Sequence, residues 1–193
     1  MTGFVKRLQD ICYSEWLHFG KQTYDINNRL FRAGMKETDP GFWQRVGVYW
    51  EVGTQMDLTG LDDDWPWSAA FISYVIRLAG AEDKFFYSIR HSDYINDAIL
   101  DSNPFFVGQR LSDYSPKIGD LVCYSRQNGV SFDNLPEKYK SHSDIVVKVN
   151  PTFIEVIGGN VGNSVSKKHL RIDGSGKLIA QNHKWFAIVE NKL

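Results

Sequence analysis

The sequence has little cysteine, no excess of charge of either sign and no long apolar run. Its 193 residues include two cysteines, Cys12 and Cys123, which lie far apart and define no disulfide framework, so we expect both to be small buried hydrophobic residues. The 22 basic and 23 acidic residues nearly cancel. Because no lysine and arginine cluster stands out, nucleic acid and anionic membranes are not expected as partners.

Sequence features of a membrane span and of a secretory signal are also missing. No apolar run approaches the roughly 20 residues that cross a bilayer. The N-terminal residues mix charges with apolar residues at helical spacing and lack the uninterrupted apolar core of a signal peptide. We therefore expect the chain to be made in the cytoplasm without a signal peptide. Export by a signal-independent secretion system, or release by lysis, leaves no mark in a sequence, so the destination stays open.

Length and composition favour one domain that spans residues 1–193 around a single core. Apolar residues at helical spacing predict one helix over about the first twenty residues and another from Asp39 and Pro40 onward. We therefore expect residues 1–60 to form a helical N-terminal extension and residues 64–165 to form the core motif region.

In the second half of the chain, the spacing of the apolar residues changes from a helical to a strand pattern. After Gly80, Ser92 or Asp93 can cap a short helix that ends before Pro104. From Pro116 onward, short β-branched and aromatic runs separated by Gly, Asn, Asp and Pro predict strands; the runs are 116–126, 143–150, 152–159 and 185–191. The sequence therefore predicts an α+β fold with helices packed on an antiparallel sheet or partial barrel.

One predicted helix carries a serine in its first turn. Asp64 can cap this helix, Pro66 suits its first turn, and Gly80 ends it after a broad apolar face. A helix N-terminus carries about half a positive charge, which stabilises an anion that develops beside it. Ser68 is therefore the predicted reactive centre for acyl transfer, although serine is also common in first turns simply as an acceptor for free backbone donors.

A serine nucleophile needs a base, because its hydroxyl stays protonated at neutral pH. Our first choice is His142, which stands where a predicted strand begins and can be presented rigidly at a sheet edge. His91 is the second choice, since it directly precedes a predicted helix cap. Each also fits an ordinary loop or turn histidine. The other histidines have no pattern that raises them above surface residues; they are His18, His169 and His183.

A histidine base usually needs a polar group to fix its tautomer and orientation. Asn160 is placed for this role at the end of the next predicted strand, and Gly158 and Gly159 before it permit close backbone approach. Gly-Gly-Asn is also simply a good turn. Glu155 is the competing orienter, with Asp144 behind it.

Metal binding is not predicted. The run Asp62–Asp64 is acidic, but it lacks the alternating ligand spacing and central glycine of a calcium loop. There is no HExxH motif and no paired-cysteine pattern. We expect a solvated loop there, and neither a metal nor a cofactor.

Four motifs in order carry a resemblance to a known superfamily; they are DWPWSAAFISYVIRLAG (64–80), PKIGDLVCY (116–124), SHSDIVVKV (141–149) and IEVIGGNVGNS (154–164). Together they resemble the CHAP and NlpC-type papain-fold amidases. Those families show a helix that opens with Trp-Cys-Ala-Ala-Phe-Val-Ser or Asp-Cys-Ser-Gly-Phe, then a Gly-Asp strand, a histidine-led strand and a Gly-Asn or Glu-Asn ending. YWEVG, PWSAAFIS and RHSDYI look more closely like a bacterial domain-of-unknown-function branch with serine at the nucleophile position.

The resemblance implies a papain-like fold with Ser68 as nucleophile, His142 as base and Asn160 as orienter. We expect the cleft to be lined by Trp65, Trp67 and Tyr74, with His91 as a further substrate-binding residue. Serine departs from the family pattern, because a hydroxyl loses its proton far less easily than a thiol. A natural serine enzyme, an inactive relative and an engineered replacement of cysteine all fit this departure.

The implied activity is hydrolysis of amide bonds in cell-wall peptide, by a lysis protein or by an effector delivered through a secretion system. Its partners would be a peptidoglycan peptide or a protein substrate, together with an immunity or secretion-carrier protein. The alternative is an inactive papain-fold effector or binding module that acts through protein contacts. A weaker alternative is an acyltransferase or deamidase that acts on a host protein.

Overall fold

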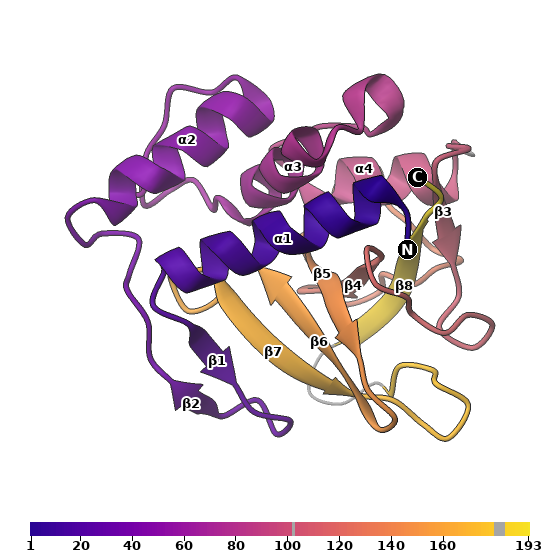
Figure 1. Ribbon diagram of the computed structural model, residues 1–193. Helices are drawn as coiled ribbons and strands as arrows, with labels where there is room; N and C mark the ends of the chain where they lie inside the picture. The colour runs from indigo at the N-terminus through magenta and orange to yellow at the C-terminus, as the bar shows by residue number, and fades with distance from the viewer. Residues whose placement is uncertain (102, 180–183) are drawn as a thin grey trace.

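The computed structural model describes residues 1–101, 103–179 and 184–193. These residues form four α-helices, one 3-10 turn and one eight-stranded sheet. In Figure 1 the helices gather over one face of the curved sheet, with α1 running across its strands. The predicted α+β class is confirmed.

The helices begin and end close to their predicted positions. Thr2 caps the first one, since its Oγ1 accepts a hydrogen bond from the backbone N–H of Val5 at 3.2 Å. The predicted short helix begins one residue before Ser92. The helices are α1 (Gly3–His18), α2 (Phe42–Thr54), α3 (Ser68–Ala79) and α4 (His91–Ile99), with the 3-10 turn η1 (Glu82–Lys84) between the last two.

The sheet has the order β2-β1-β7-β6-β5-β4-β8-β3. Every neighbouring pair is antiparallel except β1 and β7, which run parallel. The strands are β1 (Gln22–Tyr24), β2 (Leu30–Arg32), β3 (Phe106–Gln109), β4 (Leu121–Ser125), β5 (Ser141–Val149), β6 (Phe153–Gly158), β7 (Ser166–Arg171) and β8 (Lys184–Asn191).

Two features of the sheet differ from the prediction. The first sixty residues are not wholly helical, because β1 and β2 extend the sheet at one edge. Three-residue strands are too short to show a period of two. The sequence also missed β3, which has only four residues, and β7, whose Lys167 and Lys168 obscure its alternation although Lys168 is buried.

Helix α3 packs at the centre of the molecule, between α1, α2 and the sheet. Phe71, Ile72, Val75 and Ile76 are fully buried, and removing one such large side chain typically costs about 2–5 kcal/mol of stability. A second apolar cluster, which includes Val122, lies apart from this core. The start of α3 is therefore held rigidly against the sheet.

The two ends of the chain meet beside the sheet. Thr2 Oγ1 donates a hydrogen bond to the carbonyl of Leu193 at 2.8 Å, and Figure 1 shows both termini near β8.

None of the described helices combines the length and the apolar character needed to cross a bilayer.

Candidate functional site

Ser68 is the first residue of α3. Trp67 is the N-cap and offers no side-chain hydrogen bond to the first turn, and the helix ends at Gly80, which is left-handed with φ 92°. The predicted cap is wrong, since Asp64 and Pro66 lie before the helix. The placement of Ser68 in the first turn and the stop at Gly80 are confirmed.

The hydroxyl of Ser68 contacts an imidazole. Ser68 Oγ lies 2.7 Å from Nε2 of His91, the first residue of α4. On the other side of the ring, His91 Nδ1 lies 2.9 Å from Ser143 Oγ and also hydrogen-bonds the Tyr94 hydroxyl. The Tyr94 and Ser143 hydroxyls are themselves 2.6 Å apart. His91 is thus held between Ser68 and two neutral hydroxyls.

This network accommodates the tautomer that a base requires. With its proton on Nδ1, His91 donates to Ser143 or Tyr94, and Nε2 accepts the hydrogen bond from the Ser68 hydroxyl. Burial lowers the pKa of His91 well below its ordinary value, and the neighbouring His142 lowers it further. The imidazole is therefore neutral at neutral pH, so in this tautomer Nε2 is unprotonated and faces the Ser68 hydroxyl.

His142 lies in a separate, charged network. Its Nε2 is 3.0 Å from Asp144 Oδ1, and Asp144 Oδ2 is 2.6 Å from Lys168 Nζ. Burial alone would raise the pKa of Asp144, but Lys168 and His142 together hold it well below its usual value. The carboxylate is therefore ionised. Within the described residues, His142 Nδ1 is buried and has no hydrogen-bond partner.

The structure brings His91, and not His142, into hydrogen-bond contact with Ser68. The two imidazole rings lie 5.0 Å apart, centroid to centroid, at an angle of 48°. This differs from the predicted Ser68–His142 pair, because the start of α4 places His91 on the serine. The sequence analysis ranked His142 above His91, although His91 is nearer to Ser68 along the chain.

The polar partner of His142 is Asp144, the last of the three candidates that the sequence offered, and not Asn160. Asp144, two residues along β5, shares a sheet face with His142 because strand side chains alternate. Asn160 sits in the turn after β6 with φ 54°, and in the described part of the chain its side chain makes no hydrogen bond to His142. Glu155, the other predicted orienter, instead pairs with Lys167 at 2.9 Å.

Close backbone approach at the two glycines is confirmed. A Cβ on Gly158 would lie 2.0 Å from Asp144 Oδ1, and a Cβ on Gly159 would lie 2.4 Å from Phe71 Cβ. No larger residue fits at either place. The end of β6 thus packs directly on α3 and on the His142–Asp144 pair.

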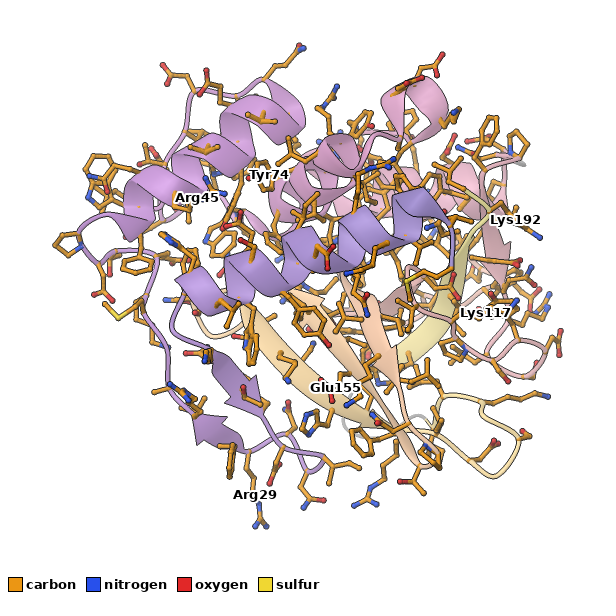
Figure 2. The ribbon with its side chains drawn as sticks, viewed as in Figure 1. Arg29, Arg45, Tyr74, Lys117, Glu155 and Lys192 are labelled. Carbon is orange, nitrogen blue, oxygen red and sulfur yellow. The ribbon has the colours of Figure 1, made fainter. Side chains whose placement is uncertain are left out.

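Two of the predicted cleft residues belong to the core instead. Trp67 is 2% exposed, and its Nε1 donates to the carboxylate of Glu37. Tyr74 is buried, and its hydroxyl contacts Arg45 and Glu15; Figure 2 shows Tyr74 beside Arg45 between the helices. Tyr74 follows Ser68 by six residues, which at about 100° each turns it far from the serine side of α3. Trp65 alone is partly exposed, at 44%.

Ser68 and His91 open onto a cavity of about 590 Å³. Pro66, Ile89 and Tyr139 form apolar parts of its wall, and residues 126–127 and 138–141 form one side. This volume is in the range of small-molecule sites. Sequence reasoning missed this wall, because these residues lie far from Ser68 along the chain.

The remaining sequence candidates have structural roles. Cys12 and Cys123 are free and buried as predicted, and burial raises the pKa of both thiols. Asp62 accepts hydrogen bonds from the backbone and hydroxyl of Thr59. No group of three or more potential metal-ligating side chains occurs in residues 1–101, 103–179 and 184–193. His183 lies outside the described residues.

Comparison with known proteins identifies a family. Residues 55–190 match the family described as "Uncharacterized protein conserved in bacteria (DUF2272)". The chain belongs to this DUF2272 family. No curated protein and no solved structure matches it. The DUF2272 match spans α3, α4, the strands β3 to β7 and all but the last residue of β8, so it includes Ser68 and both buried histidines.

Proposed function

We propose that this chain is a papain-like acyl-transfer hydrolase in which Ser68 attacks an amide carbonyl and His91 accepts the serine proton. The observation that carries the proposal is the 2.7 Å contact between Ser68 Oγ and His91 Nε2 at the start of a helix, on the wall of a cavity. A nucleophile within hydrogen-bond reach of a neutral base is the basic unit of such sites.

The reaction runs in two acyl transfers. As the Ser68 oxygen bonds to the carbonyl carbon, its proton moves to His91 Nε2. The amide C–N bond then breaks, and His91 returns the proton to the leaving amine. A water molecule, deprotonated by the same imidazole, next attacks the acyl-serine ester. The acid is released, and the hydroxyl of Ser68 is restored.

The helix end stabilises the negative charge that develops on the carbonyl oxygen. The first backbone N–H groups of a helix have no partner within it, and Trp67 caps α3 with no side-chain hydrogen bond. The N–H groups of Ser68 and Ala69 are thus candidate donors to this oxygen. Losing one such donor typically costs about a hundredfold to a thousandfold in rate.

His142 and Asp144 act as positioning residues. The His142 ring packs against His91, and the Asp144 carboxylate behind it favours a positive charge on His91. Tyr94 and Ser143 hold the far nitrogen of His91. The hydroxyl pair thereby orients the ring and can accept the Nδ1 proton, and the carboxylate lowers the free energy of the imidazolium.

The proposed substrate is a peptide of the bacterial cell wall, and the support for it is the resemblance to CHAP and NlpC-type amidases. Within that proposal the protein works as a lysis protein or as an effector delivered by a secretion system. An immunity or carrier protein would then be its partner.

Purified peptidoglycan tests the function directly. It is incubated with the natural chain, with Ser68→Ala and with Ser68→Cys, and released fragments are measured by mass spectrometry. We expect fragments from the natural chain and none above background from Ser68→Ala. Activity in Ser68→Cys alone would identify a cysteine-type site disabled by serine, and it would contradict the proposed serine nucleophile.

A binding module is the second candidate function. Ser68 is 5% exposed, and serine stands where the resembled amidases carry cysteine. If all three proteins release nothing while the natural chain cosediments with peptidoglycan, the chain binds without turnover and the hydrolase proposal fails.

A further inference from the structure

The cavity at Ser68 carries positive charge. Besides Ser68 and His91, four basic residues line it, and no aspartate or glutamate does so among the described residues; the basic residues are Arg90, Arg126, Lys138 and Lys140. The whole chain has a formal net charge of −1. The lining of this cavity is thus basic in a chain that is nearly neutral as a whole.

Two of these cations have no carboxylate partner. In the described part of the chain, neither Arg126 nor Lys140 forms an ion pair. They lie at adjoining ends of β4 and β5, where the Arg126 N–H donates to the Lys140 carbonyl at 2.8 Å. Arg126 also lowers the pKa of the buried His91 by its charge. Both cations are therefore available to an anion beside the catalytic pair.

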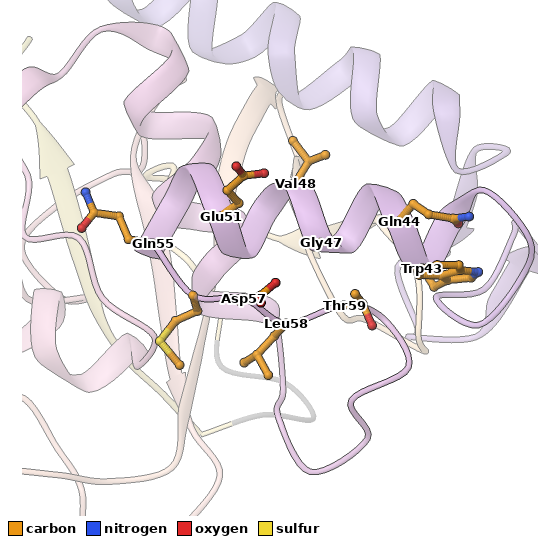
Figure 3. A pocket seen from close by; sticks show the side chains of 10 residues that line it. Trp43, Gln44, Gly47, Val48, Glu51, Gln55, Asp57, Leu58 and Thr59 are labelled. Atoms are coloured by element: carbon orange, nitrogen blue, oxygen red, sulfur yellow. The ribbon is translucent and has the colours of Figure 1, made fainter.

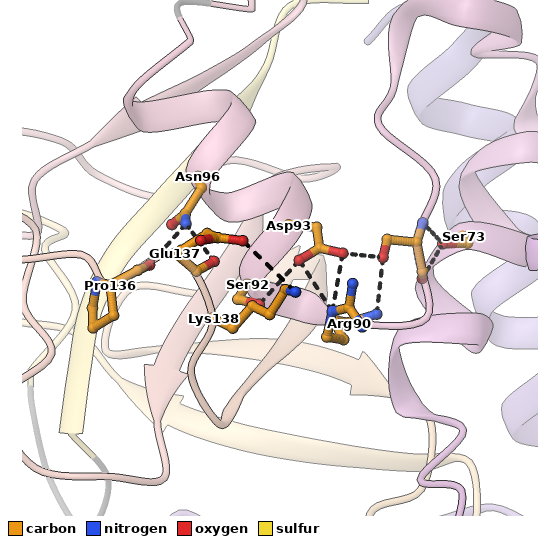
Figure 4. Close-up of polar contacts among 9 residues, drawn as sticks. Ser73, Arg90, Ser92, Asp93, Asn96, Pro136, Glu137 and Lys138 are labelled. Atoms are coloured by element: carbon orange, nitrogen blue, oxygen red, sulfur yellow. Dashed lines mark hydrogen bonds and ion pairs between the residues drawn. The ribbon is translucent and has the colours of Figure 1, made fainter.

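The other two cations have carboxylate partners. Arg90 lies 3.3 Å from Asp93, and Lys138 lies 3.7 Å from Glu137. Figure 4 shows both pairs beside α4, with Asn96 reaching the carbonyls of Pro136 and Glu137. The Lys138–Glu137 pair is exposed on both sides, and exposed pairs contribute little to stability, so an incoming anion can replace it. The Asp93 carboxylate is mostly buried and keeps Arg90 partly paired. The Asn96 contacts hold the 136–140 segment in place against α4.

A second cavity of similar size carries the opposite charge. The cavity between α2 and residues 56–59, shown in Figure 3, measures about 580 Å³ and has Glu51 and Asp57 in its wall. None of its described lining residues is basic. The fold therefore sets positive charge at one cavity and negative charge at the other.

We infer that the Ser68 cavity binds a short acidic peptide whose free carboxylates flank the bond to be cleaved. This inference rests on the proposed function and names its substrate class. Ile89 and Tyr139 supply apolar contacts for a peptide backbone and side chains, and the cations supply charge-assisted hydrogen bonds to carboxylates. The confined volume suits a few residues of peptide, whereas a nucleic acid needs an extended basic surface.

Calorimetric titration of the Ser68→Ala chain tests the inference, because binding is then measured without turnover. The probes are two peptides, acetyl-Ala-Glu-Glu-Ala and acetyl-Ala-Gln-Gln-Ala, both as C-terminal amides. Inorganic phosphate is the third ligand. We expect the acidic peptide to bind at least about tenfold more tightly than the glutamine peptide, since hydrogen bonds to charged groups are the stronger ones. High salt should reduce this preference.

Matched charge variants locate the binding site. Adding Arg126→Gln and Lys140→Gln should remove most of the preference for the acidic peptide. Arg29→Gln with Lys177→Gln removes the same charge; Figure 2 shows Arg29 at the far edge of the molecule, by β1 and β2. This control pair should leave the preference unchanged.

Several results would overturn the inference. They are equal affinity for the two peptides, binding of neither at millimolar concentration, tighter binding of phosphate than of the acidic peptide, or equal losses in both charge variants. Because Ser68→Ala is used throughout, these outcomes are independent of whether Ser68 is a nucleophile. If the chain does not digest peptidoglycan, the peptide-binding result still stands. If the peptides do not bind, the digestion result still stands.

Discussion

Two buried histidines face each other in this structure, and their surroundings are opposite. His91 hydrogen-bonds the neutral hydroxyls of Ser68, Tyr94 and Ser143, whereas His142 lies against an ionised carboxylate backed by a lysine. In the hydroxyl network, Nε2 of His91 contacts the proposed nucleophile Ser68. In the other network, His142, Asp144 and Lys168 form a buried charged cluster within the sheet. The comparison teaches that the histidine with the carboxylate is not automatically the one that contacts the nucleophile.

The largest expected effect is on stability, from Asp144→Asn. Removing the carboxylate leaves the Lys168 ammonium buried without its partner, which typically costs about 3–5 kcal/mol. Urea unfolding followed by circular dichroism measures the loss. The matched control is Asp10→Asn, which breaks the exposed Lys6–Asp10 pair and should change stability by less than about 1 kcal/mol. Equal losses in the two variants would show that the Asp144 network is no more important than a surface pair.

The next effect is on the pH dependence of stability. Burial lowers the pKa of both His91 and His142 in the folded chain, while in the unfolded chain histidines titrate near about 6.5. The unfolded state therefore binds more protons below that pH, and stability must fall as pH drops from about 6.5 toward the lowered folded pKa values.

One buried acid acts in the opposite direction. Burial raises the pKa of Asp120 to about 6, so its contribution to stability is present at low pH and is lost as pH rises through about 6. Urea unfolding of the unsubstituted chain and of His91→Gln between pH 7.5 and 5 separates the contribution of His91 from that of Asp120, because both proteins contain Asp120. The variant should lose less stability on acidification. Parallel curves would mean that His91 titrates normally in the folded protein.

The smallest effect is expected from the hydroxyl network. Ser143→Ala removes one of two partners of His91 Nδ1, and Tyr94 remains, so we expect a loss of about 1 kcal/mol and a modest fall in activity. Ser164→Ala is the control, because the Ser164 hydroxyl is buried without a hydrogen-bond partner in the described residues. It should be nearly neutral. A larger loss for Ser164→Ala than for Ser143→Ala would refute the importance of this network.

The sequence predicted those parts of the fold and the site that depend on residues close together in the chain. Helix α3 and its stop at Gly80 follow from apolar spacing and a left-handed glycine. Strands β1 and β2 are too short to show the alternation of apolar and polar residues, and the lysines of β7 obscure that alternation. The His142–Asp144 pair was within reach, since residues two apart share a strand face. His91 was only the second candidate for the base, because its contact with Ser68 depends on how α4 packs against α3 and the sheet.

The most direct test of the central claim is the rate at which a fluorophosphonate, a general reagent for activated serines, labels Ser68. It is measured by intact mass in the natural chain, in His91→Gln and in His142→Gln. If His91 is the base, its loss should slow labelling by about a hundredfold to ten-thousandfold, and the loss of His142 should slow it much less. The reverse order, or labelling that ignores both histidines, would contradict the account.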